Sequence, residues 1–402
     1  MDGSTARPSG DQVDVSFVLP CLNEAQCLEP CIGMIRDALA QLEAKHGLAG
    51  EIVVADNGST DGSQALATSL GARVVPISER GYGAALRGGF RAARGRYLVM
   101  GDADGSYNFR EAVPMIEALQ GGADLCMGSR FKGGIKPGAM PWKNRYIGNP
   151  ILTGILNVLF GTRIGDAHCG LRALTHDCFD RLGLTGAGME FASEMVIKAA
   201  LKGERIAERP ATLSPDLRDR PPHLRPWRDG WRHLRYLFML SPFWLFAVPA
   251  LAMGSAAATI LGVAGWSYLF RPGAEIFFGD YWVVLAAGML GLSHIAGILA
   301  VATHVHGVRE GYRPAWTTWI TRWVTLESMI GLGLGAGVLG LSVLAAVLFF
   351  WQARHFERAH NVYPAVLGTL LVTLGAQNIL GGFLLAIVNG NEARFLENPQ
   401  SP

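Results

Sequence analysis

Net charge, cysteine pairs and an apolar N-terminal segment are all scarce or absent in this chain of 402 residues. The 35 Lys and Arg balance 33 Asp and Glu to a net charge of +2, which argues against a nucleic-acid-binding protein that needs a strongly basic surface. No Cys-x-x-Cys pair occurs among the six cysteines, so we expect reduced core thiols and no structural zinc. Residues 1–13 are polar and contain no apolar run that could serve as a cleavable signal, which predicts a disordered segment on the cytosolic side.

Charge is also missing from four long segments in the C-terminal half. Each lacks Asp, Glu, Lys and Arg and exceeds the roughly 20 residues that cross a bilayer core. Buried helices of a large soluble core are the alternative, but such helices rarely run so long without a charge. We therefore predict an all-α membrane domain of four transmembrane helices over residues 244–388, followed by a cytosolic tail at 389–402. The four segments are Trp244–Phe270, Trp282–Thr303, Ser328–Trp351 and Pro364–Val388.

Arginine is concentrated just before the first of these segments. Residues 205–235 contain eight Arg against four acidic residues, and this bias predicts that residues 1–240 and both termini are cytosolic. Residues 214–243 also carry aromatic side chains, which is typical of a juxtamembrane segment lying on anionic headgroups. A solvated charged linker is the alternative. The residues concerned are Arg218, Arg220, Arg225, Arg228, Arg232, Arg235, Trp227, Trp231 and Tyr236.

The first 213 residues alternate between apolar runs and helical patterns. Residues 15–19, 51–55 and 97–100 read as strands, with helices expected between them. This βαβαβ pattern predicts an α/β fold with a parallel sheet, in which ligands bind beyond the carboxyl ends of the strands. The polar segments 20–24, 56–61 and 102–106 fall at those ends, so we expect them to share one edge of the sheet.

Carboxylates dominate the polar segments. Asp102 and Asp104, two residues apart after a buried strand, could hold one hard cation whose open positions take phosphate oxygens, although an acidic pair before Gly-Ser is also typical of a solvated turn. Asp56 suits either nucleoside recognition or the capping of the next helix. A third segment, with Pro20, Asn23 and Glu24, forms either a nucleotide-facing loop or a helix start.

Five motifs in order resemble those of family 2 glycosyltransferases, particularly the dolichyl- or polyprenyl-phosphate mannose and glucose synthases. They are Leu19-Pro-Cys-Leu-Asn-Glu24, Val53-Val-Ala-Asp-Asn-Gly-Ser-Thr-Asp-Gly62, Gly83-Ala-Ala-Leu-Arg87 with Ala93-Arg-Gly95, Asp102-Ala-Asp-Gly105, and Gly128-Ser-Arg-Phe131.

The resemblance implies a GT-A (Rossmann-like) domain over residues 14–213, a nucleotide-diphosphate sugar donor and a Mg²⁺ or Mn²⁺ ion. By this resemblance Asp102 and Asp104 hold the metal and diphosphate, and four residues line the nucleotide pocket: Pro20, Asn23, Glu24 and Asp56. Asn57 and Tyr82 depart from the family pattern, where Asp and Lys are frequent, so neither is carried over as a functional residue.

The charge of the acceptor indicates which residues would bind it. A lipid phosphate is mostly dianionic at neutral pH and can attack without a general base, so the protein must mainly hold the anion. Arginine grips phosphate bidentately, and the resemblance assigns Arg130 and Arg145 to the acceptor phosphate. Asp166 and Arg172 lie in a segment that resembles one near the donor sugar and acceptor.

Glu190 and Glu194 share one face of an expected helix. They either bind sugar hydroxyls or take part in helix ion pairing, as Glu194 could with Lys198.

The predicted function is inverting transfer of a hexose from a UDP-glucose- or GDP-mannose-type donor to a polyprenyl or dolichyl phosphate at the cytosolic membrane face. One alternative is transfer to a membrane lipid's hydroxyl, which would require Asp166 or Glu194 as general base. Another is a non-catalytic lipid-carrier flippase or scaffold. The sequence leaves the oligomeric state open, a homo-oligomer included.

Overall fold

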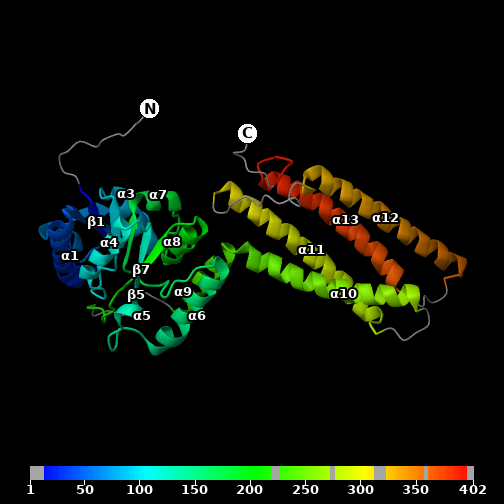
Figure 1. The fold of residues 1–402 in the computed structure, drawn as a ribbon, viewed down its shortest axis with the longest axis horizontal. Coiled ribbons are helices and arrows are strands. Elements are labelled where there is room, and N and C mark those ends of the chain that lie inside the picture. Colours follow the sequence, from blue (N-terminus) through cyan, green and yellow to red (C-terminus); the bar gives the residue numbers. More distant parts are fainter. Residues whose placement is uncertain (1–12, 219–225, 272–276, 312–322, 357–360, 396–402) are drawn as a thin grey trace. The chain divides into compact units, whose positions relative to one another are not determined.

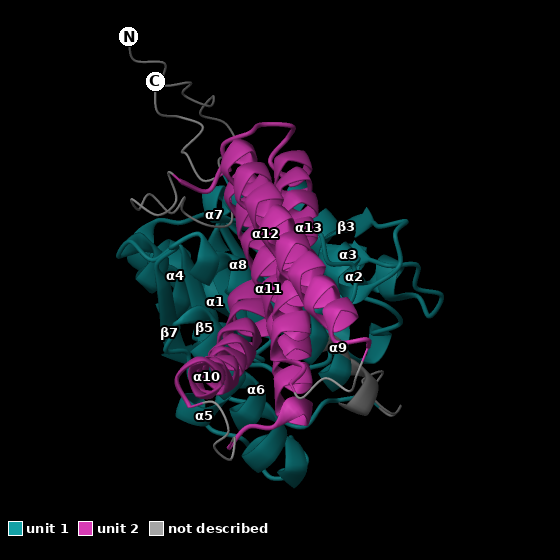
Figure 2. Cartoon of the chain, turned by 90° about the vertical axis from the view of Figure 1, so that its right-hand side faces the viewer, with its two compact units in different colours: residues 1–240 teal, residues 241–402 magenta. Residues whose placement is uncertain are grey.

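The protein divides into two compact units, residues 1–240 and residues 241–402 (Figures 1 and 2). The computed structural model describes residues 13–218, 226–271, 277–311, 323–356 and 361–395. Nearly all of the expected N-terminal disordered segment, part of the expected tail, and Arg220 and Arg225 lie outside the described residues. Each unit is described by itself below.

Unit 1 is built on a seven-stranded sheet with the strand order β3-β2-β1-β4-β6-β5-β7. Only β6 runs antiparallel to its neighbours β4 and β5 among these strands, so the predicted mostly parallel sheet is confirmed. The strands are β1 (Val15–Cys21), β2 (Gly50–Asp56), β3 (Arg73–Pro76), β4 (Tyr97–Met100), β5 (Leu125–Ser129), β6 (Arg172–Thr175) and β7 (Ile206–Pro210).

Helices cover both faces of this sheet because successive strand side chains point to opposite sides. Phe17 of β1 is buried with Ile32 and Ile35 on one face, while the next residue, Val18, is buried with Phe90 on the other. The helices and helical turns are α1 (Ala25–His46), α2 (Ser63–Ser69), α3 (Tyr82–Ala92), η1 (Phe109–Ala112), α4 (Val113–Gln120), α5 (Arg130–Gly133), η2 (Asn144–Gly148), α6 (Asn149–Phe160), α7 (His176–Leu182), α8 (Glu190–Leu201) and α9 (Pro226–Met239). The last of them, α9, packs on α6 and α8 and buries Leu237 in the second of these cores.

Strand register brings the candidate site loops together. Cys21 of β1 pairs with Asp56 of β2, and Val18 of β1 pairs with Met100 of β4. The parallel strands β1, β2 and β4 therefore end at one edge of the sheet. The segments 20–24, 56–61 and 102–106 leave from that edge, as the sequence predicted.

Unit 2 contains four helices that are long and apolar enough to cross a membrane, which confirms the predicted all-α region with four candidate spans. They are α10 (Val248–Phe270), preceded by the π-helical turn η3 (Phe243–Ala247), then α11 (Asp280–Arg309), α12 (Leu326–Ala353) and α13 (Tyr363–Val388). Glycines let α12 and α13 approach closely: a Cβ on Gly340 would lie 2.7 Å from the Gly368 carbonyl oxygen, and one on Gly333 would lie 2.7 Å from that of Gly375. Such small-residue contacts allow the van der Waals packing that holds membrane helices together.

Candidate active site

The Asp-x-Asp pair follows the fully buried strand β4 and is bound to two other parts of unit 1. Asp102 Oδ1 accepts a hydrogen bond from the Tyr82 hydroxyl at 2.9 Å. Asp104 accepts from the Ser106 amide through Oδ1 at 2.9 Å and from Arg218 Nη2 through Oδ2 at 2.5 Å. Burial, followed by the charge of Asp104, raises the pKa of Asp102 to about 6. The pair is thus a partly desolvated site where two carboxylates repel each other.

Arg218 is a member of this site that the sequence did not predict there. We assigned it to a segment on lipid headgroups, but its guanidinium instead contacts Asp104, Glu24 at 3.2 Å and Asp216 at 3.4 Å. The chain after β7 runs back along the Asp-x-Asp loop, which the Leu217 amide shows by donating to the Asp104 carbonyl at 2.9 Å. Sequence distance hid this contact, because 114 residues separate Arg218 from Asp104.

The two loops predicted to face the nucleotide are locked to each other. Asn23 has a left-handed φ of 60°. Its side-chain Oδ1 accepts a hydrogen bond from the Thr60 backbone amide at 2.8 Å, and its backbone amide donates to Ser59 Oγ at 2.9 Å. Asp61 accepts from the Ala25 amide at 3.0 Å and so caps the first turn of α1 from the neighbouring loop. The structure therefore brings segments 20–24 and 56–61 together.

Asp56 organises its own turn. Its carboxylate accepts from the amides of Gly58 at 3.0 Å and Ser59 at 3.1 Å and from the Gln64 side chain at 2.6 Å. Pro20 lies in β1 beside Ala55, one residue before Cys21 and Asp56 in the register. Asp56 is 2% exposed, so any nucleoside contact has to use lone pairs that these donors leave available.

The two departures from the family pattern are linked by structure. Asn57 donates to the carbonyls of Ile77 at 3.1 Å and Glu79 at 2.7 Å, while its Oδ1 accepts from the Gly81 amide at 2.8 Å. Only an amide can both donate and accept in this way. Asn57 thereby fixes the segment that starts α3, from which Tyr82 reaches Asp102.

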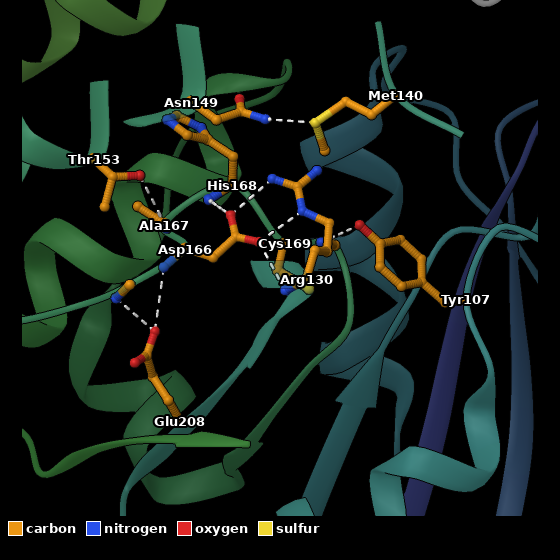
Figure 3. Close-up of polar contacts among 12 residues, drawn as sticks. Tyr107, Arg130, Met140, Asn149, Thr153, Asp166, Ala167, His168, Cys169 and Glu208 are labelled. Atoms are coloured by element: carbon orange, nitrogen blue, oxygen red, sulfur yellow. Dashed lines mark hydrogen bonds and ion pairs between the residues drawn. The ribbon is translucent and has the colours of Figure 1, made fainter. Parts of the chain in front are cut away.

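Arg130 and Asp166 form a buried bidentate ion pair (Figure 3). Nε and Nη2 of Arg130 donate to the two carboxylate oxygens at 2.7 Å each, and the Arg130 amide donates to Oδ2 at 3.0 Å. Burial alone would raise the pKa of Asp166, but the bonds and charge of Arg130 outweigh it and hold that pKa below its usual range. The third nitrogen, Nη1, has no hydrogen-bond partner among the residues that the structure describes.

The remaining two predicted arginines are half-buried in one case and fully buried in the other. Arg145 is part of η2 and lies 5.4 Å from the centroid of the Tyr146 ring. Arg172 is fully buried and donates to the carbonyls of Cys169 at 2.8 Å, Ala167 at 3.0 Å and Ala192, so it binds backbone that surrounds the Asp166 loop.

The two glutamates of α8 differ in their hydrogen-bond partners. Glu190 accepts from the Gly188 amide at 2.9 Å. Glu194 is fully buried, pairs with Lys198 at 2.7 Å and accepts from the amides of Thr185 at 3.0 Å and Gly186 at 2.7 Å. Of the two alternatives for Glu194, the structure therefore shows the ion pair with Lys198.

Comparisons with known proteins identify the family. The chain matches the model of glycosyl transferase family 2 over residues 16–183 and that of the glycosyltransferase family 2 C-terminal transmembrane region over residues 301–389. It is 35% identical over 374 residues to the low-salt glycan biosynthesis hexosyltransferase Agl6 of Haloferax volcanii, covering 92% of this chain and 88% of that protein. The chain belongs to glycosyl transferase family 2.

Two further comparisons cover the N-terminal half. The polyprenol monophosphomannose synthase of Mycolicibacterium smegmatis is 30% identical over 226 residues, which is 53% of this chain and 81% of that protein. The crystal structure of glucosyl-3-phosphoglycerate synthase from Mycobacterium tuberculosis with Mn²⁺ and uridine diphosphate is 22% identical, with a TM-score of 0.42 over 58% of this chain and 84% of that one. Unit 1 is a GT-A domain, and it is followed by a membrane region of four candidate spans.

Proposed function

We propose that this glycosyltransferase transfers a hexose, with inversion, from a nucleotide-diphosphate sugar to a polyprenyl or dolichyl phosphate at the cytosolic membrane face. In this proposal the loops carrying Asn23 and Asp56 receive the nucleoside, Asp102 and Asp104 receive the metal and diphosphate, and Arg130 binds the acceptor phosphate. The phosphate oxygen attacks the anomeric carbon while the nucleoside diphosphate leaves.

The observation that carries this proposal is the state of the two candidate general bases. Transfer to a hydroxyl needs a carboxylate that can take up a proton, and Asp166 and Glu194 were the candidates. Both are buried in ion pairs, and their cationic partners and backbone donors lower both pKa values despite burial. A dianionic phosphate acceptor needs no base, so it suits a site where these two carboxylates are held in ion pairs and are weak bases.

The contacts of Arg130 support its proposed role in binding such an acceptor. Asp166 fixes one edge of its guanidinium, and we assign to a phosphate oxygen the nitrogen Nη1, for which the described part of the chain offers no hydrogen-bond partner. Because Asp166 already holds the Arg130 side chain in one conformation, an incoming anion does not have to order it on binding, which favours affinity.

The Asp-x-Asp pair fits a hard divalent cation such as Mg²⁺ or Mn²⁺. Its oxygens are the ligand type that these ions prefer, and a cation would relieve the repulsion that contributes to the raised pKa of Asp102. When bound, the ion would neutralise charge on the leaving diphosphate. The hydrogen bond from Tyr82 orients Asp102 for that role.

An apolar surface near the acceptor residues supports a lipid substrate. Ile147, Ile151 and Val158 follow helical spacing on η2 and α6, and all are exposed, by 46%, 55% and 62%. Trp142 and Tyr146, also exposed, flank the basic residues at the start of this surface. Basic and aromatic residues beside an apolar helix face are typical of contact with anionic headgroups. Trp231 and Arg235 are exposed on α9, and we propose that this juxtamembrane helix also contacts anionic headgroups.

Similar proteins support the same class of reaction. They include a polyprenol monophosphomannose synthase and a dolichol-phosphate mannosyltransferase of Pyrococcus furiosus, which is 28% identical over 232 residues.

An assay on purified membranes tests the proposal. The full chain is incubated with radiolabelled UDP-glucose, GDP-mannose and related donors together with polyprenyl phosphate, and the lipid product is identified by mass. We expect one donor to yield a lipid-phosphate sugar and Asp104→Ala to lower the rate at least about a hundredfold. The matched control is Asp37→Ala, which removes an exposed carboxylate paired with Arg110 and should leave the rate unchanged. Absence of lipid product from every donor, or full activity in Asp104→Ala, would refute the proposal, whereas donor-dependent product excludes a non-catalytic flippase or scaffold.

A further inference from the structure

We propose that Arg218 is a built-in counter-cation of the Asp102–Asp104 site, and that a divalent metal ion must displace its guanidinium from Asp104, which loosens the chain segment 213–218. This inference rests on the proposed metal-binding function of the Asp-x-Asp pair and adds a competing group to it.

The hydrogen bonds of Asp104 carry the first step. Oδ1 already accepts from the Ser106 amide at 2.9 Å, and Oδ2 accepts from Arg218 at 2.5 Å. Both carboxylate oxygens therefore have a donor in hydrogen-bond contact. The Ser106 amide belongs to the same tight loop, so Oδ2 is the oxygen that a metal ion could gain by moving one side chain, Arg218.

The Arg218 guanidinium and a divalent metal ion would compete for Asp104 because both are positively charged. The Arg218 side chain is 15% exposed and lies against Asp104, Glu24 and Asp216, whose side chains are 11%, 9% and 33% exposed. A divalent ion on Oδ2 would lie next to the guanidinium in this poorly solvated place, where like charges repel strongly. Arg218 can retain Glu24 and Asp216 as partners after it leaves Asp104, so its release does not strand a buried charge.

Backbone contacts connect Arg218 to the rest of the segment. The Ser214 amide donates to the Ser106 carbonyl at 2.8 Å, and the Leu217 amide donates to the Asp104 carbonyl at 2.9 Å. Leu217 also covers Gly105, where a Cβ would lie 2.6 Å from Leu217 Cδ1. Segment 213–218 thus lies along loop 104–107, and displacement of Arg218 weakens the attachment at its end.

Hydrogen exchange measured by mass spectrometry on the full chain in detergent tests this inference directly. Adding MnCl₂ should speed exchange of the peptide covering residues 213–218 by about tenfold, since the Leu217 and Ser214 amides lose protection. The peptide covering β7 should not change. An arginine with a purely structural role predicts the opposite sign, because metal binding to a rigid site slows exchange around it.

Two variants complete the test, with Mn²⁺ affinity measured by calorimetry. Arg218→Gln removes the competing charge and should bind Mn²⁺ about tenfold more tightly, with no further gain in exchange when Mn²⁺ is added. Arg110→Gln, which removes an arginine paired with the exposed Asp37, should behave as the wild type.

The outcomes separate the two proposals. If the wild type does not bind Mn²⁺, the metal is removed from the proposed function and the competition with Arg218 falls with it. If Mn²⁺ binds but exchange at 213–218 slows or stays the same, the displacement of Arg218 is refuted and the proposed metal site survives.

Discussion

Replacing Asp166 with asparagine probes the ion pair that orients Arg130. The carboxylate accepts two side-chain bonds and one backbone bond from Arg130, and its exposed fraction is 0%. An asparagine would turn an NH₂ group toward one of the arginine donors and leave the buried guanidinium without a counter-charge. Removal of one partner of a buried pair costs about 3–5 kcal/mol, and we expect the lower end, about 3 kcal/mol, because the amide oxygen still accepts one bond.

A matched control isolates the effect of burial. Asp37 and Arg110 form a similar two-bond pair, but their side chains are 53% and 47% exposed. Exposed pairs contribute roughly 0–1 kcal/mol, so Asp37→Asn should cost less than about 1 kcal/mol. The measurement is urea unfolding of the full chain in detergent, followed by hydrogen exchange of the β5 and β6 peptides, which report on unit 1.

The pH dependence has a definite sign. Because the pKa of Asp166 is lowered in the folded protein, its contribution is fully present above the unfolded value near 3.9 and is lost as the pH falls through the lower folded value. The stability difference between wild type and Asp166→Asn should therefore be constant around neutral pH and shrink below about pH 4. Equal costs for Asp166→Asn and Asp37→Asn, or a difference that does not change with acid, would refute this account of the pair.

Two further changes test the other roles assigned here. Glu194→Gln should lower the stability of unit 1 by about 3 kcal/mol, because it removes the buried partner of Lys198. It should not shift the pH profile of transfer, and the exposed Glu43→Gln serves as the control. Loss of the acidic limb of that profile in Glu194→Gln would instead favour a hydroxyl acceptor. Gly340→Leu should separate α12 from α13 and lower the thermal unfolding midpoint in detergent, because a Cβ there already lies 2.7 Å from the Gly368 carbonyl, while Gly335→Leu, where a Cβ meets nothing within 4 Å, should leave the midpoint nearly unchanged. Equal midpoints for the two leucine variants would contradict the close-packing role of Gly340.

Local sequence patterns were sufficient to predict several strands and helices and to predict that three polar segments lie at one edge of the sheet. The apolar run Val15–Leu19 predicted a strand, and the uncharged runs after Trp244 predicted long apolar helices; the structure contains both. Strand β6 was not predicted, because Arg172 at its start is a buried charge that no pattern of apolar residues would place in a sheet. The buried Arg172 guanidinium is satisfied by three backbone carbonyls: those of Cys169 and Ala167 belong to the preceding loop, and that of Ala192 comes from helix α8.

Sequence motifs selected the candidate site residues but not the partners that they contact in the structure. Motifs identified Asp102, Asp104 and Arg130 because each follows a strand that local hydrophobicity defines. Periodicity could not reveal that Arg130 is held by Asp166 or that Arg218 contacts Asp104, since these pairs are 36 and 114 residues apart in the chain. Such contacts exist only when the sheet order has been set.

By itself, therefore, the sequence determined the class of fold, the four candidate membrane spans and the family motifs, because these depend on hydrophobic spacing and short-range residue order. Tertiary structure alone decided which carboxylates are engaged in ion pairs, which arginine nitrogen stays available and which cation lies on the Asp-x-Asp pair. The physical reason is that charge and burial act through space: a carboxylate's pKa and partners depend on neighbours that the chain brings from distant positions.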